Sequence, residues 1–117
     1  MYERHIVGKN GEDAATKYLI DKGYKIIERN FLCRQGEIDI IALDGDYVVF
    51  LEIKSRTNRE YGLPSESVNT RKIKHMINSI KYYLYIKKIE NKNIRIDVIE
   101  VYVKDNEYTF NHIKQVL

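Results

Sequence analysis

Residues 37–54, EIDIIALDGDYVVFLEIK, contain two runs rich in β-branched and aromatic residues on either side of Asp44-Gly45-Asp46. Turn residues between two such runs are typical of a β-hairpin, so we expect strands at 37–43 and 47–54. Because side chains alternate between the two faces of a strand, Glu52 and Lys54 should share one face. Leu51 and Ile53 should then point the opposite way, into apolar surroundings.

The register of this hairpin decides how Asp39 faces Glu52. With Gly45-Asp46 as the turn, Asp39 lies directly opposite Glu52. With Asp44-Gly45 as the turn, Asp39 is the diagonal neighbour of Glu52. Both registers place the two carboxylates on one face together with Lys54, whereas a three-residue loop or a β-bulge would separate them.

Carboxylates gathered on one face need a compensating positive charge, because two of them ~4 Å apart repel by about 4 kcal/mol at an effective dielectric of 20. Lys54 can offset part of this, and Mg²⁺ or Mn²⁺ can offset more, since both prefer hard oxygen ligands. Glu12 is a further candidate ligand if its helix packs against the hairpin. The alternatives are a surface cross-strand salt bridge for the trio and favourable charge near a helix N-terminus for Glu12. Alternation also places Glu37 on the face of Asp39 and Glu52, and the alternative is an exposed residue at the outer edge of the sheet.

The rest of the chain predicts a single α/β domain over residues 1–117. Apolar residues recur at helical spacing in 8–22 and 70–87, and further β-rich runs occupy 24–31, 94–103 and 108–113. The predicted order is α-β-β-β-α-β-β. The crossover helix between the third and fourth strands permits parallel pairing there, and hairpins join the other strands. A mixed β-sheet flanked by helices follows.

The net charge of +3 is unevenly distributed, because residues 54–95 carry 11 basic and 3 acidic side chains. This favours a surface that faces a polyanion, although a solvated helix face is the alternative. Cys33 is the only cysteine, which excludes a disulfide within the chain and a thiolate cage for zinc and indicates a lone buried thiol.

The hydropathy pattern argues against membrane contact. No apolar run approaches the ~20 residues of a membrane span, and residues 1–13 lack the apolar stretch of a secretory signal. We therefore expect a cytoplasmic protein without membrane contact.

Four stretches of the sequence resemble the YraN family of small bacterial proteins: residues 11–31, 36–56, 61–84 and 94–101. That family is placed in the PD-(D/E)xK restriction-endonuclease-like superfamily, which includes archaeal Holliday-junction resolvases. The resemblance implies a restriction-endonuclease-like fold and a Mg²⁺- or Mn²⁺-dependent endonuclease that hydrolyses DNA. Branched recombination or repair intermediates are the implied substrates.

The resemblance also implies roles for individual residues. Asp39 looks like the motif aspartate and Glu52 like the motif acidic residue, both of them metal ligands. Lys54 looks like the motif lysine that orients or polarises the attacking water. Ile53 would offer its backbone carbonyl to the metal, and Glu12 matches the extra carboxylate of the resolvases.

One position departs from the motif, since Ile38 stands where the motif's name has proline. Lys72 falls at the basic position of the second helix. The candidate nucleic-acid-binding residues are Arg56, Arg59, Arg71, Lys72 and Lys74, whose phosphate contacts would anchor the cleaved strand. Tyr61 is a candidate for stacking on an unpaired base, with a core or surface role as the alternative.

Two other classes of function fit the same residues. A non-catalytic nucleic-acid-binding module with this fold would bind in a salt-sensitive manner without cleavage. A structural interaction protein would pair the edge of its sheet with a second copy. A homodimer would also suit a nuclease that cuts two strands.

Overall fold

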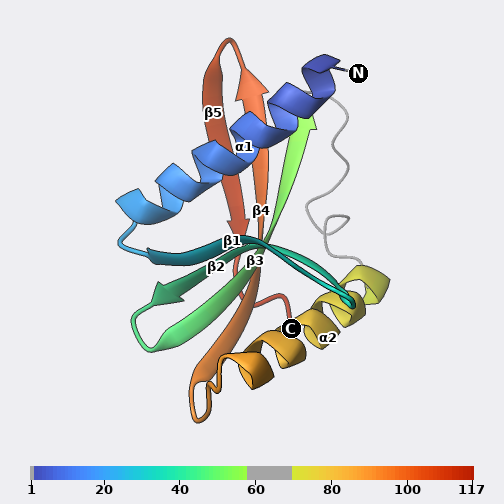
Figure 1. Ribbon diagram of the computed structural model, residues 1–117. Helices are drawn as coiled ribbons and strands as arrows, with labels where there is room; N and C mark the ends of the chain where they lie inside the picture. Colours follow the sequence, from blue (N-terminus) through green and yellow to red (C-terminus); the bar gives the residue numbers. More distant parts are fainter. Residues whose placement is uncertain (1, 58–69) are drawn as a thin grey trace.

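The computed structural model describes residues 2–57 and 70–117 and contains two helices and five strands (Figure 1). In chain order these are α1 (Tyr2–Asp21), β1 (Lys25–Cys33), β2 (Gly36–Asp44), β3 (Tyr47–Thr57), α2 (Thr70–Ile86), β4 (Asn93–Lys104) and β5 (Glu107–Ile113). The predicted order α-β-β-β-α-β-β is confirmed.

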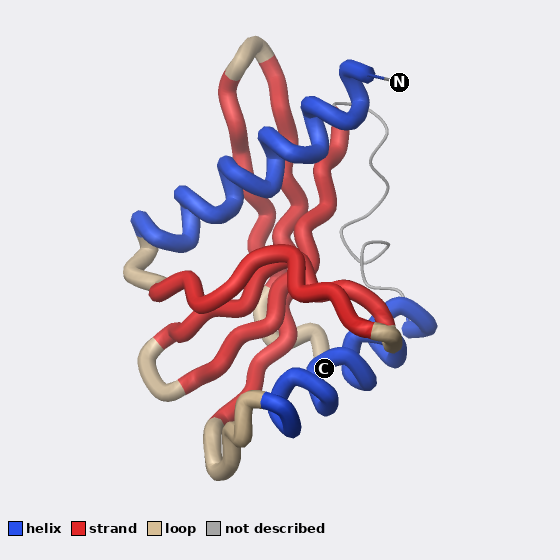
Figure 2. The backbone as a smooth tube through the Cα atoms, in the orientation of Figure 1, coloured by secondary structure: helices blue, strands red, loops and turns tan. Residues whose placement is uncertain are grey.

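The five strands form one mixed sheet in the order β1-β2-β3-β4-β5. β3 and β4 pair in parallel, and the other neighbours pair antiparallel. The parallel pair is the one that the predicted crossover helix joins, so this part of the topology is also confirmed. The sheet is strongly twisted and carries the two helices on separate faces (Figure 2).

Two apolar clusters hold the layers together. Ala15 and Leu19 of α1 pack in one cluster with Leu51 of β3. Ile80 of α2 packs in the other with Phe50. Odd-numbered residues of this part of β3 therefore face α1 and even-numbered residues face α2, as alternation requires.

Several predicted boundaries were wrong, and two of them change the interpretation of a residue. α1 begins at Tyr2 rather than at residue 8, so Glu12 lies in the middle of the helix and does not interact with its N-terminus. β3 continues to Thr57, so Arg56 belongs to the strand and not to the following loop. β1 ends at Cys33 rather than at residue 31, and this thiol is only partly buried.

The hairpin of β1 and β2 bends from one face of the sheet to the other. Ile40 packs in the cluster beneath α1, whereas Ile38, two residues earlier, packs in the cluster beneath α2. Asn30 of β1 has a positive φ of 53° at the same level. The bend brings the hairpin turn onto α2, where a Cβ added to Gly36 would lie 3.2 Å from the Ser79 hydroxyl.

Two residues singled out from the sequence, Arg59 and Tyr61, lie outside the described ranges. In the described part of the chain, neither helix is long and apolar enough to cross a membrane.

Candidate metal and nucleic-acid site

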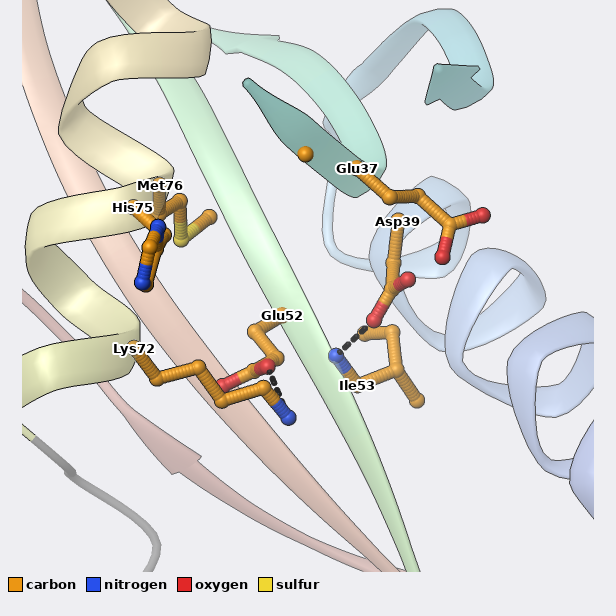
Figure 3. A pocket seen from close by; sticks show the side chains of 8 residues that line it. Glu37, Asp39, Glu52, Ile53, Lys72, His75 and Met76 are labelled. Atoms are coloured by element: carbon orange, nitrogen blue, oxygen red, sulfur yellow. Dashed lines mark hydrogen bonds and ion pairs between the residues drawn. The ribbon is translucent and has the colours of Figure 1, made fainter. Parts of the chain in front are cut away.

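A pocket of about 370 Å³ lies between the β1–β2 hairpin, β3 and α2 (Figure 3). Its lining combines three acidic side chains with a lysine and a histidine. The lining residues are Gly36, Glu37, Asp39, Glu52, Ile53, Lys72, His75 and Met76. Asp39, Glu52 and Ile53, three of the residues singled out from sequence, thus border one cavity.

The hairpin register places Asp39 at the point where β2 and β3 separate. Asp44 pairs with Tyr47, which is the first of the two predicted registers, and the last pair of the ladder is Ile40 with Leu51. Beyond it, the Ile53 N–H donates to Asp39 Oδ2 at 2.8 Å. A carboxylate thus takes the place of a strand carbonyl, because every backbone donor at a buried edge needs an acceptor.

Asp39 is held in surroundings that disfavour its negative charge. Burial, the largest cause, and the charges of Glu37, Glu52 and Glu12 together raise its pKa to about 6, although the hydrogen bond from Ile53 acts in the opposite direction. Exclusion from water and nearby carboxylates both penalise the ionised form. A cation bound in this pocket would relieve that penalty.

Glu52 points away from Asp39 in Figure 3, toward α2. Its Oε1 lies 2.7 Å from Lys72 Nζ, so the ammonium offsets part of the charge of the pocket. Lys54 does not line the cavity, but it interacts with both Glu52 and Lys72. Burial lowers the pKa of Lys54, Lys72 lowers it further, and Glu52 opposes the shift.

Glu12 lies apart from the pocket, on α1. Its Oε2 accepts hydrogen bonds from Arg29 Nη2 at 3.1 Å and from Asn30 Nδ2 at 3.3 Å. It acts on Asp39 through its charge. In this arrangement, no three His, Cys, Asp or Glu side chains of the described residues are placed to share one metal ion.

The donors at the pocket suit one kind of ion. Two carboxylates and a main-chain carbonyl, with water filling the remaining positions, match the way in which Mg²⁺ is usually held. The scarcity of nitrogen and sulfur donors disfavours zinc. The chemistry of these donors is therefore of the kind that Mg²⁺ or Mn²⁺ prefers, although Glu52 is turned toward Lys72 in this arrangement.

The predicted nucleic-acid contacts separate into two groups. Arg71 and Lys74 are exposed on α2, on the same helix as Lys72. Arg56 instead lies with its Nε 3.4 Å from Oε2 of the buried Glu100. Asn111 Nδ2 donates to the other oxygen of Glu100 at 2.8 Å, so this end of β3 carries a structural charge pair.

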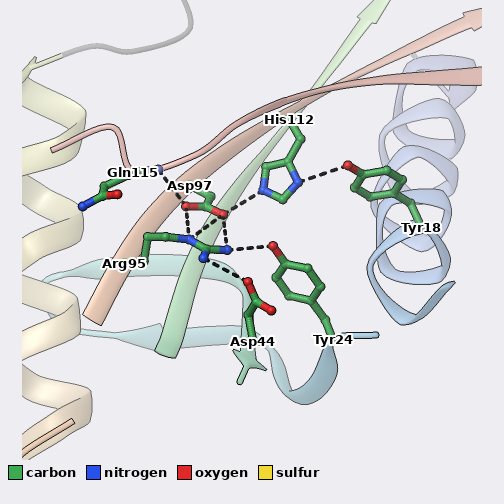
Figure 4. A network of polar contacts seen from close by, with 7 residues as sticks. All are labelled: Tyr18, Tyr24, Asp44, Arg95, Asp97, His112 and Gln115. Carbon is green, nitrogen blue, oxygen red and sulfur yellow. Dashed lines mark hydrogen bonds and ion pairs between the residues drawn. The ribbon is translucent and has the colours of Figure 1, made fainter. Parts of the chain in front are cut away.

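Sequence reasoning missed a buried polar network on β4 (Figure 4). Asp97 is fully buried, accepts hydrogen bonds from Arg95 and the Gln115 N–H, and lies 2.7 Å from His112 Nε2. Arg95 also reaches Asp44 and the Tyr24 hydroxyl. The available signal was the charged pair within the apolar run IRIDVIEVYV.

The network is structural. It joins strands β2, β4 and β5 to α1, because Tyr18 OH lies 3.2 Å from His112 Nδ1. Although burial by itself would raise the pKa of Asp97, the hydrogen bonds from His112 and Arg95 hold it below its ordinary value. Residues 95–101 of β4 are all buried, so both faces of this strand are covered.

Comparison with known proteins supports one family. Residues 11–101 match the model of a family described as "Uncharacterised protein family UPF0102". A UPF0102 protein of Clostridium perfringens is 46% identical over 110 residues, covering 92% of this chain and 90% of the relative. Relatives from Carboxydothermus hydrogenoformans and Persephonella marina are 40% and 43% identical over 114 and 109 residues. They cover 97% and 93% of this chain and 97% and 90% of their own lengths.

Proposed function

Because the chain belongs to the uncharacterised protein family UPF0102, whose description states no activity, we propose a function from the site itself: a metal-dependent nuclease that hydrolyses DNA phosphodiester bonds. The observation that carries the proposal is the convergence of Asp39, Glu52 and the Ile53 backbone on one pocket in which Asp39 resists ionisation. The resemblance to the YraN family and to PD-(D/E)xK nucleases agrees with these residues.

The proposed chemistry assigns a distinct task to each residue. A divalent cation, when bound, supplies an activated water and offsets the charge that gathers on the phosphate. Asp39 and Glu52 would hold the ion, with the Ile53 carbonyl beside them. Lys54 donates hydrogen bonds that orient the attacking water, and its lowered pKa reflects a partly desolvated amine close to Lys72.

The basic side of α2 serves substrate binding in this proposal. Lys72 contacts the phosphate next to the cleaved bond, and its present partner, Glu52, would exchange that ammonium for a bound metal. Arg71 and Lys74 are exposed further around the helix and hold the flanking backbone. Electrostatic contacts of this kind position a strand without reading its sequence.

The direct test is cleavage of supercoiled, single-stranded and four-way-junction DNA in the presence of Mg²⁺ or Mn²⁺. Asp39→Ala and Lys54→Ala should lower the rate at least about 100-fold. Asp46→Ala, which changes an exposed carboxylate in the β2–β3 turn, is the matched control and should leave the rate unchanged. Undiminished cleavage by Asp39→Ala would rule out the assignment.

A melting-temperature titration with Mn²⁺ tests the metal site without a substrate. A ligand that binds only the folded state stabilises it in proportion to the logarithm of its concentration. The wild type should therefore gain stability with Mn²⁺, and Glu52→Ala should gain less. Salt-sensitive DNA binding with neither cleavage nor a Mn²⁺ effect would support a non-catalytic binding module instead.

A further inference from the structure

A second pocket lies on the other side of the β1–β2 turn. Its volume is about 450 Å³, and it is lined by residues 31–35 of the hairpin together with Tyr82 and Ile86 of α2. The turn itself rests on α2 through the close approach of Gly36 to Ser79. Gly36 also lines the Asp39–Glu52 pocket, so one short turn separates the two cavities.

This second pocket exposes apolar surface that the fold does not cover. Leu32 is 76% exposed, and Tyr82 and Ile86 are each 40% exposed. Phe31 forms the buried side, with its ring centroid 6.3 Å from that of Tyr82. Arg34 and Gln35 are exposed at the same pocket and supply hydrogen-bond donors. An apolar, partly aromatic cavity with a few polar groups is typical of a site for a planar ligand.

The two pockets lie along the same helix, and the nearest α2 residues that line them are six positions apart. Met76 lines the first and Tyr82 lines the second. Six residues of α-helix rise about 9 Å. That length corresponds to roughly two or three nucleotides stacked at 3.4 Å along a strand.

Charge indicates which partner occupies the second pocket. Residues 70–89 contain six basic side chains and no acidic one, and Lys74 and Lys81 are exposed on α2. A second copy docked through this helix by a two-fold axis would bring like charges together, whereas a polyanion would be attracted.

We propose that the pocket formed by Leu32, Arg34 and Tyr82 binds an unpaired nucleobase of the DNA strand held at the Asp39–Glu52 site, an inference that rests on the function proposed above. The base stacks on Tyr82, and Arg34 and Gln35 hydrogen-bond to its edge or to the adjacent phosphate. Bases within an intact duplex are stacked inside the helix and do not reach such a pocket. The substrate class is therefore DNA with a single-stranded or splayed segment beside the cleaved bond.

Binding measured without divalent cations tests this subsite separately from cleavage. The probes are a fluorescently labelled single-stranded oligothymidylate and a blunt duplex of equal length, titrated with protein in EDTA. Tyr82→Ala should weaken binding of the single strand at least about fivefold, the lower end for loss of one stacked base, and change duplex binding little. Tyr85→Ala is the matched control on the same helix, because Tyr85 is 81% exposed and not a lining residue.

Replacing one base at a time by an abasic site locates the contact. An abasic site at one position should weaken binding to the wild type by a factor similar to that of Tyr82→Ala. The same abasic site should weaken binding to Tyr82→Ala much less, because the stacking partner of that base is already absent. Leu32→Ser serves as a second variant, since its exposed side chain contributes little to folding. Circular dichroism of each variant verifies the fold.

Three results would overturn the inference. They are equal effects of Tyr82→Ala and Tyr85→Ala, no preference of the wild type for the single strand, and a concentration-dependent dimer that Tyr82→Ala dissociates. Loss of the subsite in this assay with Asp39-dependent cleavage intact would leave the nuclease assignment standing. Base-dependent binding in a protein that does not cleave DNA would support the subsite and contradict the nuclease assignment.

Discussion

The Ile53 N–H donates a 2.8 Å hydrogen bond to the side chain of Asp39, just beyond the last backbone pair between β2 and β3. This bond fixes a carboxylate at the edge of β3, one residue from Glu52. It also holds the Asp39 charge in buried surroundings near three other carboxylates. The burial and the nearby carboxylates that would favour a bound cation therefore lower the free energy of unfolding of the metal-free protein.

Asp39→Asn should stabilise the metal-free protein at pH 7. The pKa of Asp39 is raised from 3.8 to about 6 on folding, so the folded state binds more protons than the unfolded state between these values. Stability is therefore lost as the pH rises through that window, by up to about 3 kcal/mol. Asparagine keeps the acceptor for Ile53 and removes the charge.

Urea unfolding in EDTA at pH 7 and pH 4 checks this prediction. The gain of Asp39→Asn should be present at pH 7 and should largely vanish near pH 4, where the wild-type carboxyl is protonated in the folded state. Asp46→Asn, at an exposed position, should show no such dependence. An Asp39→Asn variant less stable than the wild type at pH 7 would contradict the argument.

Lys72→Ala should separate metal binding from substrate binding. Removing the ammonium 2.7 Å from Glu52 Oε1 abolishes a like-charge repulsion toward a divalent cation, so the Mn²⁺ concentration needed to raise the melting temperature should fall severalfold. Cleavage should nevertheless slow, because a phosphate contact is lost. Lys74→Ala, an exposed neighbour, should leave the Mn²⁺ titration unchanged. A rise in the Mn²⁺ requirement of Lys72→Ala would exclude the proposed exchange.

Asp97→Asn should be strongly destabilising. The carboxylate is fully buried and is the buried counter-charge of Arg95, so an amide leaves Arg95 with only the partly exposed Asp44, at a cost of about 3 kcal/mol. Thermal unfolding should show a melting temperature lower by roughly 10 °C or more. Asp105→Asn is a matched control, since Asp105 is exposed with a positive φ of 51°, a conformation that asparagine tolerates. Equal melting temperatures for the two variants would show that the network contributes little.

The same network predicts an acid limit of stability. Because the pKa of Asp97 is lowered in the folded protein, its contribution is present above the ordinary value of 3.8 and is lost as the pH falls toward the folded value. The wild type should therefore lose stability on acidification below about pH 4, and Asp97→Asn should lose less. Unfolding free energies of both proteins between pH 5 and pH 2.5 give the comparison.

Gly11 provides a test of how α1 sits on the sheet. A Cβ at this position would collide with the Ser55 hydroxyl, which lies next to Lys54 in β3. Gly11→Ala should gain about 1 kcal/mol of helix propensity and lose about as much or more to this overlap. In a Ser55→Ala background the loss should be smaller, because only the 3.3 Å approach to the Cβ of residue 55 remains, so the double-mutant cycle should show a coupling energy near 1 kcal/mol. If the effects of Gly11→Ala and Ser55→Ala on stability were additive, α1 would have moved away from Ser55 without loss of stability.

Local pattern and turn chemistry determined the element order, narrowed the hairpin to two registers and permitted the parallel pairing of β3 with β4. Alternation needs only neighbouring residues, and the structure then shows which of the two turns is used, since Asp44 pairs with Tyr47. The crossover helix likewise restricts how its two strands can pair. These features were predictable because each depends on contacts close in sequence or on a general rule of chain connection.

Only the tertiary structure decided which charges meet. The bend of the β1–β2 hairpin, which moves Ile38 and Ile40 to different clusters, turns Asp39 toward the backbone of Ile53. Lys72 meets Glu52, and Asp97 meets His112, because helix packing and strand order bring distant segments together. Charge compensation inside a protein depends on through-space distance and burial, which periodicity along the chain does not encode.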